Sequence, residues 1–124
     1  MITGIGVDIV EVKRMERWLG NPALLNRYFH QEELSLALSR KNSAAQTLAA
    51  RFAAKEAFGK ALGTGLAEVE LKDIIVINND KGKPDIKLTG TAQKAFEKSG
   101  ADKTHISLTH ERENAVAMIV LEGA

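Results

Sequence analysis

The chain has 124 residues, of which 44% are hydrophobic and 27% are charged, and its formal net charge is +1. This length predicts a single domain over residues 1–124, and the apolar content excludes intrinsic disorder. The small net charge gives no global attraction to nucleic acid or to an anionic membrane, and no apolar run approaches the roughly 20 residues of a membrane span. The absence of cysteine excludes disulfides, thiolate metal sites and a cysteine nucleophile, and it fits a cytoplasmic location.

An alternating pattern predicts a first strand over residues 2–10. One of its faces carries Gly4, Gly6 and then Asp8. Because glycine has no side chain, another backbone or a ligand can come close to this face, which leaves Asp8 beside open space. The alternative is structural, since Asp8 and Glu11 have the spacing of a capping box that opens the next helix.

A helix is predicted from residue 12 to residue 19, ended by the Gly-Asn-Pro sequence at 20–22. Lys13, Arg14 and Arg17 group on one side of it. A cluster of this kind is commonly a solvated face, and it is also suited to docking an acidic partner.

Two further helices are expected, the first over residues 31–40 and the second from Ser43, as its cap, to Gly63. The inward residues of the first are expected to be Leu34, Ala37 and Leu38. At some 20 residues, the second helix would span about 30 Å and form the spine of the domain.

β-Hairpins and one more helix are predicted for the rest of the chain. The strands are expected at residues 71–78, 84–88, 105–109 and 115–121, and the helix from Thr89 or Thr91 to Ser99. Helices interleaved with hairpins predict an α+β fold, with an antiparallel sheet packed against the long central helix and the shorter helices.

Glu56 lies in the spine helix among Phe, Ala and Gly neighbours, on no clean polar face. Three interpretations of Glu56 are open: its side chain is exposed, it is paired with Lys60 one turn further on, or it binds a ligand. A surface Glu–Lys pair of this spacing contributes only about 0.2–0.5 kcal/mol to helix stability. If the fold brings Glu56 to Asp8, two carboxylates about 4 Å apart repel by about 4 kcal/mol at an effective dielectric constant near 20, so a cation or a shared proton must join them.

Mg²⁺ fits this pair best, because it prefers oxygen ligands and commonly completes its shell with water and substrate phosphate. Lys55, Lys60 and the glycine turn at 63–65 could supply charge and backbone donors to that phosphate. The turn is also an ordinary helix terminator. No nucleophile elbow, Walker loop or dinucleotide fingerprint is present.

The histidines give weaker signals. His105 shares a strand face with Ser107 and Thr109, a pattern more typical of a hydrogen-bonded sheet surface than of a catalytic pair. His30 and His110 have no companions and are expected at the surface.

Four segments carry a resemblance that covers the whole chain. They are GIGVDIVEVKRM at 4–15, RFAAKEAFGKALGTG at 51–65, NDKGKP at 79–84 and HISLTHE at 105–111. Together they resemble the holo-[acyl-carrier-protein] synthase family, the short bacterial 4′-phosphopantetheinyl transferases. One departure is Asn114-Ala115, where the family often carries Tyr-Ala.

The resemblance implies transfer of the phosphopantetheine arm from coenzyme A to a serine of apo acyl carrier protein, with release of adenosine 3′,5′-bisphosphate, in fatty acid biosynthesis. It also implies dependence on Mg²⁺ and a homotrimer with sites at subunit boundaries. The residue roles that it implies are Asp8 and Glu56 for metal, Glu56 and Lys60 for catalysis, Lys60, Gly63, Gly65, Pro84 and His105 for coenzyme A, Arg14 and Arg17 for carrier docking, and Arg51 for a substrate or subunit contact. The proton acceptor is left open between Glu56 and a water on the metal. The alternative is a non-catalytic module that docks an acidic protein through the basic helix.

Overall fold

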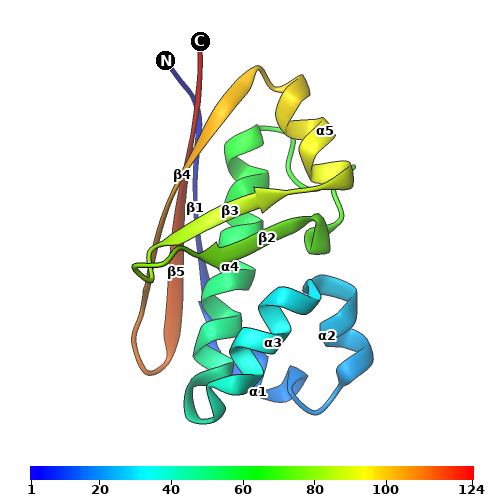
Figure 1. The fold of residues 1–124 in the computed structure, drawn as a ribbon, viewed down its shortest axis with the longest axis vertical. Coiled ribbons are helices and arrows are strands. Elements are labelled where there is room, and N and C mark those ends of the chain that lie inside the picture. Colours follow the sequence, from blue (N-terminus) through cyan, green and yellow to red (C-terminus); the bar gives the residue numbers. More distant parts are fainter.

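The computed structural model describes residues 1–124 as five strands and five α-helices, which confirms the predicted α+β class (Figure 1). The strands are β1 (Ile2–Glu11), β2 (Ile74–Asn78), β3 (Pro84–Leu88), β4 (Ala101–His110) and β5 (Asn114–Gly123). The α-helices are α1 (Val12–Trp18), α2 (Pro22–Tyr28), α3 (Gln31–Ser39), α4 (Ala44–Leu62) and α5 (Gly90–Lys98), with 3₁₀ turns at Lys41–Ser43 and Leu71–Asp73.

The strands form two antiparallel sheets, one with the order β1-β5-β4 and the other a β2–β3 hairpin. The long helix α4 packs along β1 and β5, and β3 lies next to β4. Figure 1 shows the hairpin crossing α4, with α1, α2 and α3 gathered at the helix's N-terminal half. No helix is both long enough and apolar enough to cross a membrane.

The contact between β1 and α4 depends on two glycines. A Cβ at Gly4 would collide with the carbonyl oxygen of Ala61, and one at Gly6 with that of Ala57. The strand backbone therefore lies directly on the helix backbone, as the bare face of the predicted strand indicated. This contact fixes the position along α4 at which Asp8, two residues after Gly6, meets the helix.

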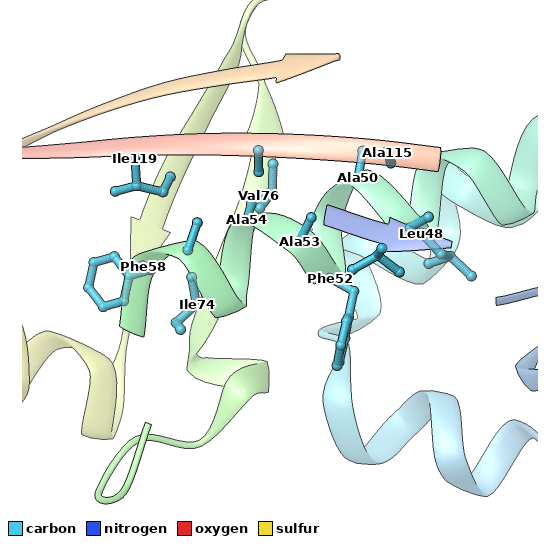
Figure 2. Packing of buried hydrophobic residues seen from close by; sticks show 14 of the residues in the cluster. Leu48, Ala50, Phe52, Ala53, Ala54, Phe58, Ile74, Val76, Ala115 and Ile119 are labelled. Carbon is cyan, nitrogen blue, oxygen red and sulfur yellow. The ribbon is translucent and has the colours of Figure 1, made fainter. Parts of the chain in front are cut away.

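Helix α4 is buried on almost every side, because sheet, hairpin and helices surround it (Figure 2). Half of its buried positions are alanine, which lets the neighbouring elements approach closely, while Leu48, Phe52 and Phe58 fill the wider spaces. Figure 2 shows the Phe52 ring turned away from β5. A helix buried all round has no single apolar stripe, which explains why its pattern was not amphipathic.

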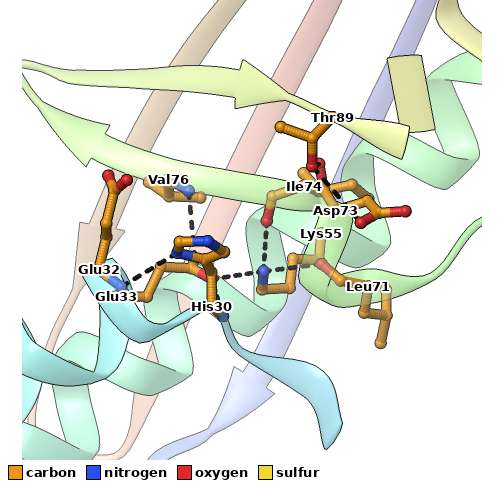
Figure 3. A network of polar contacts seen from close by, with 9 residues as sticks. All are labelled: His30, Glu32, Glu33, Lys55, Leu71, Asp73, Ile74, Val76 and Thr89. Carbon is orange, nitrogen blue, oxygen red and sulfur yellow. Dashed lines mark hydrogen bonds and ion pairs between the residues drawn. The ribbon is translucent and has the colours of Figure 1, made fainter. Parts of the chain in front are cut away.

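A buried ion pair joins α4 to α3 and to the start of β2 (Figure 3). Lys55 Nζ lies 2.7 Å from Glu33 Oε1, and both side chains have 0% exposure. The ammonium also donates hydrogen bonds to the carbonyl oxygens of Leu71 and Ile74. The other carboxylate oxygen, Glu33 Oε2, accepts from the backbone N–H of Val76 at 3.1 Å. All three donor positions of the ammonium are therefore used inside the protein.

Three local expectations are wrong or only partly met. Leu38 is 52% exposed, because α3 turns only Leu34 and Ala37 of the expected set inward. Ser43 stands at the N-cap of α4 but makes no capping bond with its side chain. His30 is not a bare surface residue, because its Nδ1 accepts from the Glu32 N–H and begins α3 in a capping box with Glu33.

Candidate active site

Asp8 lies where the inner face of β1 meets α4, and the two α4 residues beside it, Glu56 and Lys60, are one helical turn apart. Lys60 Nζ donates to Asp8 Oδ1 at 3.0 Å and to the carbonyl oxygen of Val7 at 3.0 Å. The Lys60 side chain is 56% exposed and that of Asp8 19%. The capping role considered for Asp8 is wrong: β1 continues to Glu11, which is itself the N-cap residue of α1 and makes no side-chain capping bond.

Glu56 lies beside the same groups and is half-buried. Burial raises the pKa of Glu56 above its usual value, and the nearby Asp8 carboxylate raises it further, while Arg14 and Lys60 oppose the shift. Four charged side chains from β1, α1 and α4 thus act on one another at this point. Sequence reasoning gave Arg14 a place on the helix face but not a place beside Glu56.

The donor set at this point suits a hard divalent cation. Asp8 and Glu56 offer carboxylate oxygens, and no third His, Cys, Asp or Glu joins them to form a larger cluster. Burial is the main cause of the raised pKa of Glu56, and the Asp8 carboxylate adds to it in spite of Arg14 and Lys60, so a cation between the two carboxylates would be favoured. Two carboxylates leave most of an octahedral shell to water or to substrate oxygens, which is the usual arrangement for Mg²⁺.

The glycine turn begins at the end of α4, one turn after Lys60. Gly63 has φ 83° and Gly65 has φ 70°, both in the left-handed region that favours glycine. Gly65 N–H is bonded to Gly59 O at 3.1 Å, and all three turn residues are exposed. The turn therefore closes the helix and stands free at the same end as Lys60.

Pro84 and His105 come together elsewhere, in a hollow of about 280 Å³ between the β2–β3 hairpin and β4. His105 Nε2 lies 2.8 Å from Glu122 Oε1, and this hydrogen bond lowers the pKa of Glu122. In the sheet, His105 is opposite Val120, which is opposite Ile5. His105 therefore points to the outer face of the sheet, whereas Asp8 lies on the inner face.

That outer face is unusually apolar. Its exposed large side chains are Ile5 (59%), Val7 (55%), Ile9 (62%) and Met118 (42%). Val7 and Met118 are direct partners across β1 and β5, so the side chains form one continuous stripe. A contiguous apolar stripe of this kind is typical of a protein contact surface.

Arg51 stands apart from Glu56, about 140° round α4 at roughly 100° per residue. It is 3% exposed, and its Nε and Nη2 atoms have no hydrogen-bond partner. Burial lowers the pKa of Arg51, with Glu33 opposing and Arg40 adding to the shift. Within one chain, Arg51 is therefore not part of the Asp8–Glu56 site.

Lys55 is also outside the site. The suggestion that it helps to bind a phosphate is wrong, because its ammonium is enclosed by Glu33 and backbone carbonyls. No sequence signal pairs Lys55 with Glu33, which lies 22 positions earlier.

Larger hollows, of about 490 and 550 Å³, lie around residues 64–72, against α5 and α2 respectively. Neither hollow is lined by Asp8 or Glu56. The candidate site is therefore identified by its charged side chains and not by the volume of a cavity.

Residues 4–119 match the model of the 4′-phosphopantetheinyl transferase superfamily. The chain therefore belongs to this superfamily. It is 55% identical to the holo-[acyl-carrier-protein] synthase of Treponema denticola, over 99% of this chain and 100% of that protein. It is 50% identical to the enzyme of the same name from Treponema pallidum, over 99% of this chain and 98% of that one.

Solved structures agree with this membership. The holo-(acyl-carrier-protein) synthase of Bacillus anthracis in complex with CoA (3′,5′-ADP) matches with a TM-score of 0.84 and 39% identity, covering 100% of this chain and 99% of that one. The holo-[acyl-carrier-protein] synthase of Neisseria meningitidis matches with a TM-score of 0.87 and 36% identity, covering 98% and 99%.

Proposed function

We propose that this protein transfers the 4′-phosphopantetheine arm of coenzyme A to a serine of apo acyl carrier protein and releases adenosine 3′,5′-bisphosphate. The observation that carries this proposal is the meeting of Asp8, Glu56 and Lys60, from two segments 48 positions apart, at one half-open site. Relatives that match over the full length are named for this activity, and one of them was solved with coenzyme A.

In the reaction, the serine oxygen attacks the phosphorus that carries the pantetheine arm, and the diphosphate bridge to the adenosine side breaks. The new bond joins serine to phosphorus, and the bridging oxygen leaves with adenosine 3′,5′-bisphosphate. Transfers of this kind depend mainly on positioning and on neutralising charge. Asp8 and Glu56 would hold Mg²⁺, which supplies charge neutralisation for the phosphoryl oxygens when bound.

Lys60 and the glycine turn bind the diphosphate. The Lys60 side chain is 56% exposed, so its ammonium can exchange Asp8 for a phosphate oxygen. Glu56 is the residue of this chain placed to accept the serine proton, because its carboxyl lies beside Asp8 and Lys60 at the half-open site; in the metal-free protein, burial and the Asp8 carboxylate raise its pKa. The exposed Gly63 and Gly65 allow the diphosphate to approach the backbone closely.

The active assembly is a homotrimer with a site at each subunit boundary. Pro84 and His105 contribute to coenzyme A binding, but within one chain they line a separate hollow and His105 points to the face of the sheet opposite Asp8, so they would serve the site of a neighbouring subunit. The apolar stripe on the outer face of the sheet, next to His105, gives the contact surface. Arg51, with two unpartnered nitrogens, makes a substrate or subunit contact in this assembly.

Arg14 and Arg17 receive the carrier protein. Both are exposed on α1 and line a hollow of about 430 Å³ beside the end of β1. An acidic helix placed on them brings its serine toward Glu56, because Arg14 is among the charges that act on that carboxyl.

The test is mass spectrometry of apo acyl carrier protein after incubation with this protein, coenzyme A and Mg²⁺. The expected result is a mass gain equal to the phosphopantetheine arm, formed far more slowly by Asp8→Ala and Glu56→Gln variants that keep their fold. Retained labelling in both variants would remove the proposed site. A non-catalytic docking module would give no mass gain, and coenzyme A with Mg²⁺ would not raise its unfolding temperature.

A further inference from the structure

An aromatic cluster lies directly behind Arg14, where α1, α2 and α4 meet. The Trp18 and Tyr28 rings are stacked with centroids 5.3 Å apart, and Phe52 meets Trp18 edge-on at 5.2 Å. Phe52 is 3% exposed, whereas Trp18 and Tyr28 are half-buried. The cluster is therefore anchored in the core at Phe52 and reaches the surface at Trp18.

The Arg14 guanidinium rests on this cluster. Its central carbon lies 4.8 Å from the Phe52 ring centroid and 5.2 Å from that of Trp18. Both distances are within the range at which a cation is attracted to an aromatic face. Arg14 itself is exposed and forms no ion pair, so its N–H donors remain available to a carboxylate from outside.

The other basic residues of α1, Lys13 and Arg17, lack this support. Arg17 lies on the same helix and lines the same hollow, yet its guanidinium lies over no aromatic ring. A free arginine loses side-chain freedom when it binds a partner, whereas one already held over a ring loses less. The two arginines of the docking surface are therefore not equivalent.

We propose that Trp18 and Phe52 are positioning residues for the carrier-protein substrate, because they hold the Arg14 guanidinium at the edge of the Asp8–Glu56 site in the orientation that meets an acidic side chain of the carrier. This inference rests on the proposed function. It adds a specificity element, namely a guanidinium fixed by its planar contact with the rings. A lysine at position 14 keeps the charge but cannot reproduce this contact.

Steady-state kinetics with each substrate varied separately test the proposal. Trp18→Leu is expected to raise the KM for apo acyl carrier protein by about 3- to 30-fold, the range that one cation–π contact supports. The KM for coenzyme A and the kcat at saturating carrier should stay within about twofold of wild type. Trp18→Phe keeps an aromatic face and should restore most of the carrier affinity.

A double-mutant cycle separates this role from packing. Arg14→Lys should raise the carrier KM in the wild type but add little in the Trp18→Leu background, because the ring contact is already lost. The matched control is Arg17→Lys, whose effect should multiply with that of Trp18→Leu. Trp18 is the only tryptophan, so its emission should also change on titration with apo carrier protein and not with coenzyme A.

Distinct outcomes overturn the inference and the proposed function. If the wild type fails to label carrier protein at all, the proposed function fails. If the wild type labels it but Trp18→Leu leaves the carrier KM unchanged, raises both KM values equally, or combines with Arg14→Lys as independent factors, the positioning role is wrong.

Discussion

Helix α4 carries two lysine–carboxylate pairs five residues apart, and they have opposite characters. Lys55 and Glu33 are 2.7 Å apart with 0% exposure on both sides. Lys60 and Asp8 are 3.0 Å apart, but their side chains are 56% and 19% exposed. The chemistry of the two pairs is the same, so their surroundings decide what each pair does.

The sealed pair has no capacity left for a ligand, since the backbone of the β2 segment and of α3 meets its remaining donors and acceptors. The open pair has Asp8 and Lys60 joined by one contact, with Glu56 alongside and without a cation of its own. A buried pair is costly to break, whereas an exposed pair contributes little to stability and exchanges partners readily. Substitutions at the sealed pair are therefore expected to lower the stability of the protein, and substitutions at the open pair to lower its activity.

The largest expected effect is on the sealed pair. Lys55→Met leaves the Glu33 carboxylate buried without its cation and should lower the free energy of unfolding by about 3–5 kcal/mol. Urea denaturation followed by circular dichroism measures this loss. The double variant Lys55→Met/Glu33→Leu should recover part of the stability, because no lone buried charge remains. If the single and double variants lose the same free energy of unfolding, a lone buried Glu33 charge is not the cause of the loss.

At the open site, Glu56→Gln should reduce the rate of carrier labelling by about 10²- to 10³-fold, as the loss of a group acting on transition-state charge does. Its free energy of unfolding should not fall, because a half-buried carboxylate beside Asp8 is being replaced by a neutral amide. The labelling rate and the urea midpoint are measured for the same variant. A fall in the midpoint as large as that of Lys55→Met would contradict the distinction between the sealed pair and the open site.

The β1–α4 contact can be strained without touching a charge. Gly6→Ala puts a methyl group into the Ala57 carbonyl oxygen and should cost about 1–3 kcal/mol of stability through overpacking. It should also slow labelling, since Asp8 follows on the same strand. Gly20→Ala is the control, because a Cβ there meets nothing within 4 Å. If the two variants melt at similar temperatures, the β1 backbone at Gly6 does not lie directly on α4.

Lys60→Met should change the free energy of unfolding by less than about 1 kcal/mol, because the pair that it breaks is largely solvated. The expected consequence is a higher KM for coenzyme A, since the diphosphate loses a cation. Separate titrations of coenzyme A and carrier protein would detect this, and an equal rise in both KM values would argue against a diphosphate role.

The smallest effect is on the pH dependence of stability. Burial and the Asp8 carboxylate raise the pKa of Glu56 in the folded protein, so its contribution is fully present below the unfolded value of 4.5 and is lost as pH rises through the folded pKa. Relative to Glu56→Gln, the metal-free wild type should therefore lose stability across that interval. Parallel urea titrations from below pH 4.5 upward would reveal the difference, and identical curves would contradict the raised pKa.

Local pattern was enough to predict the five strands and every α-helix except α2 (Pro22–Tyr28). The glycines at 4 and 6 marked a strand face for close packing, and Gly63 marked the end of α4, because these properties depend on residue type and short spacing. Burial of Leu38 was wrongly expected, because α3 has a weak pattern and only its packing against α4 and β2 selects the inward face.

The sequence by itself determined the α+β class, the bare face of β1 and the motifs that place the chain in its superfamily, since periodicity, glycine spacing and motif identity are properties of the chain alone. Only the tertiary structure decided that Lys55 is a sealed clamp while Lys60 stays open, that Arg14 rests on Trp18 and Phe52, and that His105 faces away from Asp8. These depend on which distant segments meet, and a helix buried on almost all sides carries no pattern that names its neighbours.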